Sequence, residues 1–133
     1  MSENLDLVRS IYADWERGDW SHVEWADPEI EYVLADGPEP GSWKGVAAME
    51  ETWSSRLSAF DDFRVTVSQY RELDEDRILV FVRQYGRGKS SGLDIDDMGG
   101  RAAAVLHVRN GRVTRLVLYA GSDRALADLG LEE

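Results

Sequence analysis

The spacing of apolar residues divides this chain into a helical first half and a strand-rich second half. In the first half, apolar residues recur every three or four positions, which is typical of helices that bury one face. Helices are predicted over residues 4–17, 20–25 and 46–60. Between them, residues 29–35 alternate between apolar and polar side chains, which predicts one strand. Residues 36–41 are rich in glycine and proline, and we expect a loop there.

The period of the pattern changes to two from residue 63 onward, which indicates strands. Four strands are predicted, over residues 63–73, 77–87, 101–109 and 112–120. Asn110–Gly111 is the strongest turn signal, because the hairpin turn that it favours needs positive φ angles at both central residues. A last short helix is predicted over residues 123–129.

The order of these elements favours an α+β fold, with a single domain over residues 1–133. We expect a cone-shaped α+β barrel, in which a strongly curved, mostly antiparallel sheet carries helices on its concave face. A sheet of this shape encloses a cavity of the kind that holds a small molecule.

The composition excludes several classes of partner. Asp and Glu number 26 against 15 Lys and Arg, so the formal charge of −11 repels nucleic-acid backbones. No apolar run approaches the ~20 residues that a membrane helix needs, and no signal-type apolar stretch follows the N-terminus. We therefore expect a soluble, cytoplasmic protein that binds neither nucleic acid nor a membrane.

No motif points to a metal or another cofactor. The chain has no cysteine, and its two histidines, His22 and His107, are far apart and lack neighbouring ligands. The segment 94–99 resembles the start of a calcium loop, but Met98 and Val105 occupy positions that require acidic ligands. We expect no cofactor.

Several short motifs follow one another along the chain. They are Gly18–Asp19, the segment 26–32 that enters the first strand, Trp43–Lys44–Gly45, Ser91–Gly92 and the segment 109–113 at the last hairpin. In these motifs the chain resembles a SnoaL-like domain of the nuclear-transport-factor-2-like superfamily, over nearly its whole length. The resemblance implies a fold but no single activity, because the superfamily includes isomerases, cyclases, epoxide hydrolases, dehydratases and non-catalytic binders.

Ketosteroid isomerases of this superfamily use a strand carboxylate as the base, and a tyrosine and a protonated aspartate as the oxyanion hole. The resemblance places the base at Val33 or Leu34 and the two oxyanion-hole residues at Ile11 and Ala104. Tyr12 is one residue away from the tyrosine position. Because none of the aligned side chains can perform this chemistry, steroid-type isomerisation is disfavoured.

Asp36 and Glu31 are the candidate catalytic bases. The register of the first strand decides which of them reaches the cavity, since a shift of one residue turns every side chain to the other face. In one register, Glu31 points inward. In the other, which the apolar alternation favours, Ile30 and Tyr32 point inward and Asp36 lies at the cavity rim.

Aromatic residues are the candidate walls of the cavity. All five tryptophans occur in the first 53 residues, on or near the predicted helices. The residues expected to line a mainly apolar cavity are Tyr12, Trp15, Tyr32, Trp53, Phe81 and Leu118. Arg83 shares a face with Phe81, which the resemblance places inward, so Arg83 would need a buried carboxylate or an anionic ligand there.

The last two strands carry apolar side chains on both faces. One face continues toward the cavity, and the other holds Val105, His107, Val117 and Tyr119. The second face is too apolar for open solvent, so we expect a homodimer in which this outer sheet face packs against a second copy.

Two functions are compatible with these features. The first is a small-molecule-binding protein that acts as an isomerase, cyclase or hydrolase and uses a cavity carboxylate for proton transfer on a small apolar organic substrate. The alternative is a non-catalytic ligand-binding or accessory dimer.

Overall fold

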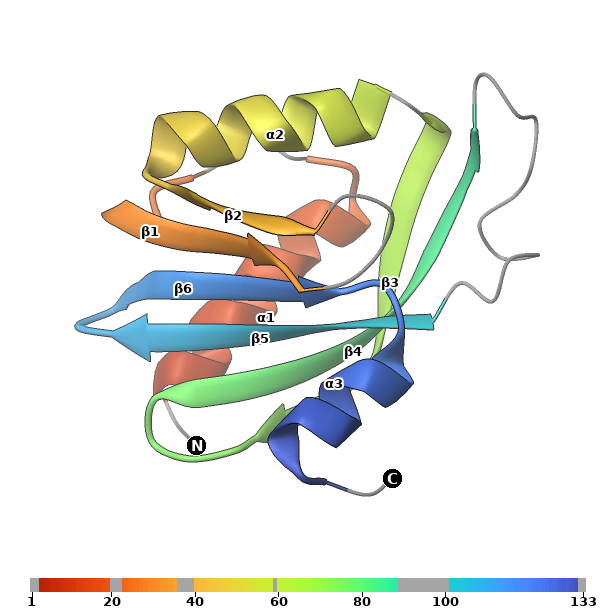
Figure 1. Cartoon of the computed structure of the whole chain (residues 1–133). Coiled ribbons are helices and arrows are strands. Elements are labelled where there is room, and N and C mark those ends of the chain that lie inside the picture. Colours follow the sequence, from red (N-terminus) through yellow and green to blue (C-terminus); the bar gives the residue numbers. More distant parts are fainter. Residues whose placement is uncertain (1–2, 20–22, 36–39, 59, 89–100, 132–133) are drawn as a thin grey trace.

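The structure is a computed structural model that describes residues 3–19, 23–35, 40–58, 60–88 and 101–131. Along the chain, its elements are α1 (Glu3–Glu16), β1 (Ala26–Leu34), β2 (Gly41–Lys44), α2 (Val46–Ser58), β3 (Phe60–Glu72), β4 (Arg77–Gly88), β5 (Arg101–Arg109), β6 (Arg112–Tyr119) and α3 (Ser122–Leu129). Figure 1 shows how these helices and strands are arranged.

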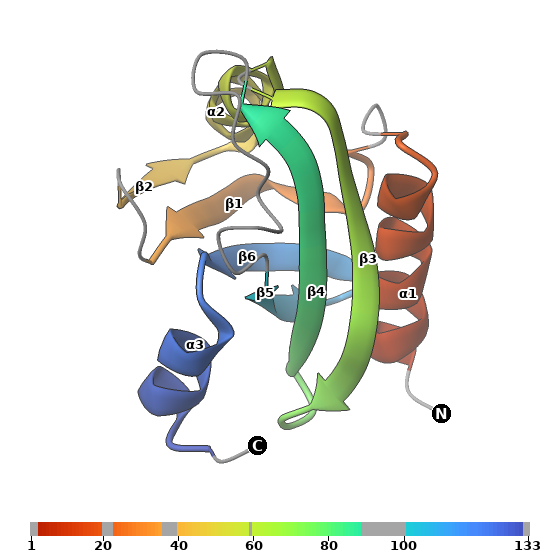
Figure 2. The same cartoon turned by 90° about the vertical axis from the view of Figure 1, so that its right-hand side faces the viewer.

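The six strands form one sheet in the order β2-β1-β6-β5-β4-β3. Neighbouring strands are antiparallel, except β1 and β6, which run parallel. The long β3–β4 hairpin bends along its length (Figure 2). Asn110 and Gly111 have φ angles of 55° and 75°, which confirms the predicted turn between β5 and β6. The expected α+β class, with a curved and mostly antiparallel sheet, is confirmed.

The helices divide between the two faces of the sheet. α1 and α2 lie on one face, which we call the inner face, whereas α3 lies on the opposite, outer face against β5 and β6 (Figures 1 and 2). α3 takes this position because Ala125 and Leu126 bury their apolar side chains there. Within the described ranges, no helix is long and apolar enough to cross a membrane.

A separate hydrophobic cluster covers each face of the sheet. The inner cluster joins the apolar stripe of α1 and the buried side of α2 to inward residues of the strands. The outer cluster consists of Leu79, Phe81, Ala103, Val105, Val117 and Tyr119 from the sheet with Ala125 and Leu126 from α3. Because α3 already buries this outer face within one chain, its burial does not require a second copy. The homodimer therefore stays a prediction.

Two segments differ from the sequence-based expectation. β2 begins at Gly41, inside the predicted loop, and pairs with β1 so that Trp43 lies opposite Tyr32. The short helix expected over residues 20–25 is not formed over residues 23–25, and residues 20–22 lie outside the described ranges. In residues 23–25, the carbonyl oxygen of Trp25 instead accepts a hydrogen bond from the Val113 amide of β6, which joins this segment to the sheet.

Candidate functional site

Aromatic rings on the inner face form a connected network. Within the described residues, it contains Tyr12, Trp15, Trp25, Tyr32, Trp43, Trp53 and Tyr70. Tyr12 and Trp15 lie one turn apart on α1, with their ring centroids 4.6 Å apart. Trp15 contacts Trp53 of α2 at 4.9 Å, and Trp53 lies 6.3 Å from Tyr32 of β1. The network therefore ties both inner-face helices to the sheet.

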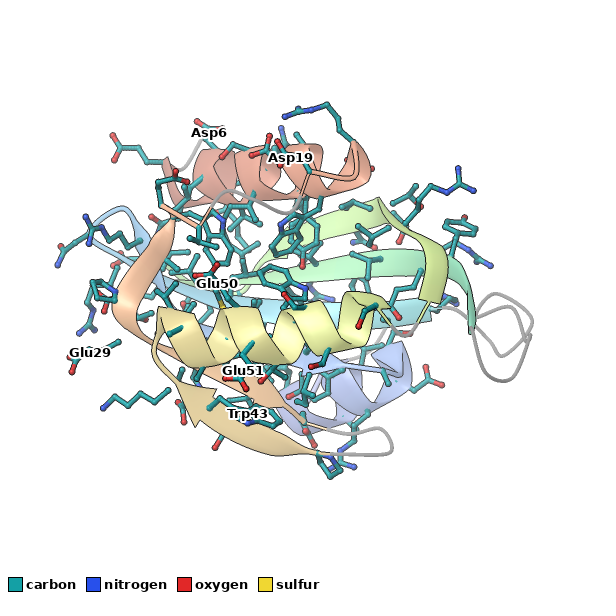
Figure 3. The ribbon with its side chains drawn as sticks, turned by 90° about the horizontal axis from the view of Figure 1, so that it is seen from above. Asp6, Asp19, Glu29, Trp43, Glu50 and Glu51 are labelled. Atoms are coloured by element: carbon teal, nitrogen blue, oxygen red, sulfur yellow. The ribbon has the colours of Figure 1, made fainter. Side chains whose placement is uncertain are left out.

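The ring pairs of this network have two geometries. Most pairs meet edge to face, with interplanar angles of 76–87°. This is a preferred arrangement of packed aromatic side chains and indicates a well-packed core. Tyr32 instead meets Trp43 and Trp53 at tilts of 43° and 31°, with centroids 6.1 and 6.3 Å away. Figure 3 shows Trp43 beside β2, on the side of α2 that faces away from α1.

Tyrosine hydroxyl groups, together with the indole N–H groups of the tryptophans, are the polar groups of the network. Burial raises the pKa of Tyr12 far above its usual range, and the nearby Tyr70 and Tyr32 raise it further. Burial and the Glu16 carboxylate also raise the pKa of Tyr70, whereas the Arg9 guanidinium, 5.4 Å from its ring centroid, lowers it. Tyr12 and Tyr70 therefore stay neutral near pH 7 and can donate or accept hydrogen bonds.

Five of the residues expected to line the cavity share the inner face. Tyr12, Trp15, Tyr32 and Trp53 are buried in the inner cluster, and Leu118 packs against it. They converge because the helical spacing of α1 and α2 and the alternation of β1 and β6 direct these side chains to one side.

Sequence reasoning missed Trp25, Trp43 and Tyr70 as members of this site. The pairing of β3 with β4 shifts register between Val67 and Gln69, so that Val67 and Tyr70 both face the inner cluster although they are three residues apart. Strict alternation would have placed them on opposite faces. Trp43 was missed because it lies on β2, a strand that the sequence pattern did not predict.

Phe81 and Arg83 lie on the other side of the sheet. Phe81 belongs to the outer cluster, whereas its neighbours Val80 and Val82 belong to the inner one. By alternation, Arg83 follows Phe81 outward, and it lies opposite Arg101 of β5. The inward orientation expected for Phe81 and Arg83 is therefore wrong. Both faces of β4 are apolar, so alternation alone does not tell which of them α1 and α2 cover.

The two candidate bases have different positions. Glu31 is exposed on the outer side of β1, and its Oε1 atom lies 3.0 Å from Nε of Arg115 on β6. Ile30 and Tyr32 are fully buried, so the register favoured by the apolar alternation is the observed one. The sheet therefore separates the Glu31 carboxylate from the aromatic network. Asp36 lies outside the described residues.

The described part of the inner face is a buried apolar and aromatic layer that also contains neutral hydroxyl groups. Its buried residues are all apolar or aromatic, and none is an aspartate or glutamate. Among the residues that the structure describes, no group of three or more His, Asp or Glu could hold a metal ion. A surface depression at the β3–β4 turn is lined by residues 72–75, none of which belongs to the network.

Comparison with known proteins adds information about the fold. Residues 8–116 match the family model of the SnoaL-like domain. An NTF2-like protein of unknown function from Burkholderia pseudomallei has a similar structure, with a TM-score of 0.76, 17% identity and coverage of 96% of this chain and 97% of that chain. No curated protein sequence matches this chain.

Two further similar structures carry more specific names. A candidate polyketide cyclase from Sinorhizobium meliloti has a TM-score of 0.65 and 19% identity, covering 85% of this chain and 93% of that chain. TerC, co-crystallized with polyporic acid, has a TM-score of 0.71 and 20% identity, covering 96% of this chain and 98% of that chain. At these identities the likeness shows a shared fold.

Proposed function

The chain belongs to the SnoaL-like domain family, and on that premise we propose that it binds a small, planar, apolar organic molecule on the aromatic inner face. The aromatic network is the observation that carries this proposal. Aromatic side chains provide large apolar surfaces at defined angles, and binding sites for small molecules are lined mainly by such residues.

The polar groups of the network narrow the chemistry of the ligand. Tyr12 and Tyr70 are neutral phenols near pH 7, and the hydroxyl oxygen of Tyr32 is buried. Neutral hydroxyl groups suit a carbonyl or phenol oxygen on the ligand. The formal charge of −11 disfavours an anionic ligand over a neutral one. A neutral aromatic ketone therefore represents the ligand class that we propose.

A proton-transfer enzyme is the second candidate function. The similarity to a candidate polyketide cyclase favours it, since that protein shares the fold. In this chain the catalytic base would be Asp36, because the Glu31 carboxylate is paired with Arg115 on the outer face. The binding proposal does not depend on Asp36, so the Asp36→Asn variant separates the two functions: it would retain binding and lose turnover.

A titration with 9-fluorenone, followed by tryptophan fluorescence, tests the binding proposal. The matched variants are Tyr32→Phe on the inner face and Tyr119→Phe on the outer face, each of which removes one phenol hydroxyl from a buried ring. We expect saturable quenching, with affinity about three- to tenfold weaker in Tyr32→Phe, the usual effect of one hydrogen bond. The affinity of Tyr119→Phe should match that of the unmodified chain. Equal weakening by both variants, or no saturable quenching at all, would contradict the proposal.

A further inference from the structure

Trp43 occupies the margin of the aromatic network. It lies on β2, a four-residue strand at the edge of the sheet, and its side chain is only partly buried. Its ring contacts that of Tyr32, which lies directly opposite it on β1. At a tilt of 43° and a centroid distance of 6.1 Å, this contact is looser than the edge-to-face pairs around Trp15.

Tyr70 lies at the other margin of the network and has different contacts from Trp43. Tyr70 is also partly buried, but the guanidinium of Arg9 lies over its ring and Tyr12 meets it edge to face. A cation over an aromatic face is attracted to it, which favours one position of the ring. The two ring contacts are of similar length, 6.4 Å for Tyr70 and 6.1 Å for Trp43, so the Arg9 guanidinium is what distinguishes the Tyr70 margin from the Trp43 margin.

Gly41 fixes where the Trp43 indole lies. A Cβ atom at position 41 would be 3.2 Å from Cη2 of Trp43, 3.6 Å from Cζ2 and 3.7 Å from Cζ3. The six-membered part of the indole therefore packs against the backbone of Gly41. Gly41 is not among the residues with positive φ, so an alanine fits the backbone there and its methyl group would shift the indole by a few tenths of an ångström.

We propose that Trp43 is the ring against which the ligand packs as it enters the aromatic site, with Tyr32 on the inner side, and that Gly41 is a positioning residue for this ring. The inference rests on the proposed function and specifies its access side, at the β2 edge of the sheet. The tilted rings of Tyr32 and Trp43 lie 6.1 Å apart between centroids, so a ligand that packs between them must displace the Trp43 indole, and a flat ligand requires a smaller displacement than a bulky saturated one. Trp43 thus selects for flat ligands.

A double-mutant cycle tests this proposal. The variants are Gly41→Ala, Trp43→Phe and the double variant, with Gly121→Ala as the control. Gly121 has φ −119° and nothing within 4 Å of an added Cβ atom, so alanine is tolerated there. The probe is N-phenyl-1-naphthylamine, a neutral aromatic compound whose fluorescence rises in apolar sites. Affinity and association rate are measured together with urea unfolding, which shows whether each variant is folded.

We expect Gly41→Ala to weaken probe binding about fivefold and to slow association, and Gly121→Ala to change neither quantity by more than twofold. In the Trp43→Phe background, Gly41→Ala should lose most of its effect, because the smaller ring leaves room for the methyl group. A purely structural role of Gly41 would lower the midpoint of unfolding in Gly41→Ala and leave the affinity of the folded protein for the probe unchanged.

The failures of the two proposals are distinguishable. If the unmodified chain binds the probe but Gly41→Ala has no effect, or the same effect in both backgrounds, the role of Trp43 is refuted and the binding function stands. If the unmodified chain binds neither the probe nor 9-fluorenone, the binding function is refuted and the access side with it.

Discussion

His107 lies on the outer side of β5, directly opposite Arg77 of β4 and Arg115 of β6. The two arginines are paired in turn with Asp74 at 2.8 Å and Glu31 at 3.0 Å. Burial lowers the pKa of His107, Arg115 and Arg77 lower it further, and the two carboxylates oppose this shift. At the residue scale, burial and the two neighbouring arginines therefore favour a neutral imidazole at His107, as burial favours a neutral phenol at Tyr12.

The lowered pKa of His107 predicts how stability depends on pH. Above the unfolded pKa of about 6.5, both states hold a neutral imidazole and stability is unaffected by this group. As pH falls below that value, the unfolded state binds a proton that the folded state does not, so the free energy of unfolding falls until the folded pKa is passed. Urea titrations at pH 7.5 and pH 5.5 measure this decrease.

The comparison of variants assigns that pH dependence to His107. The decrease should be smaller in His107→Gln than in the unmodified chain. His22→Gln, which removes the other histidine of the chain and leaves His107 in place, should retain it. An identical decrease in the unmodified chain and in His107→Gln would show that other groups cause the dependence.

At the scale of elements, periodicity predicted the long helices and strands but not how they are placed. The stripe of α1 identified Tyr12 and Trp15 as inward residues, since a helix has one apolar face. β4 has two apolar faces, so its alternation could not decide whether Phe81 points toward α1 or α3. β2 is too short for a pattern, and the register shift in β3 has no signal in the sequence.

The contact between α1 and β3 leads to another prediction at this scale. β3 is an edge strand, and Oε2 of Glu16 accepts a hydrogen bond from the Val67 amide at 3.2 Å. Without this acceptor the amide faces solvent, so Glu16→Ala should speed hydrogen exchange at Val67 by about two- to tenfold. Glu16→Gln keeps an acceptor oxygen and should stay within twofold of the unmodified chain.

Exchange at Val80, in the interior of the sheet, serves as the internal reference for that experiment. Its rate reports global unfolding, so the ratio of the Val67 rate to the Val80 rate separates a local effect at the edge of β3 from a change in overall stability. Exchange at Val67 that is equally slow in Glu16→Ala would mean that the side chain does not protect the edge of β3.

At the scale of the whole molecule, the sheet separates two sets of apolar contacts with different consequences. The inner set contains the aromatic network and the proposed ligand site, and the outer set is closed by α3. The apolar pattern on both faces was visible in the sequence, and it suggested a dimer because nothing showed that α3 would cover the outer face. The function rests on the inner set, whose membership required the fold as well as the sequence.

The most direct test of the binding proposal is an NMR titration with 9-fluorenone that follows backbone amides and indole N–H groups residue by residue. We expect the largest shifts at Trp43, Trp53 and Tyr32 on the inner face, and none beyond the general background at Val105 and Val117 on the outer face. Shifts concentrated on the outer face, or no saturable shifts at any of these residues, would contradict a ligand site within the aromatic network.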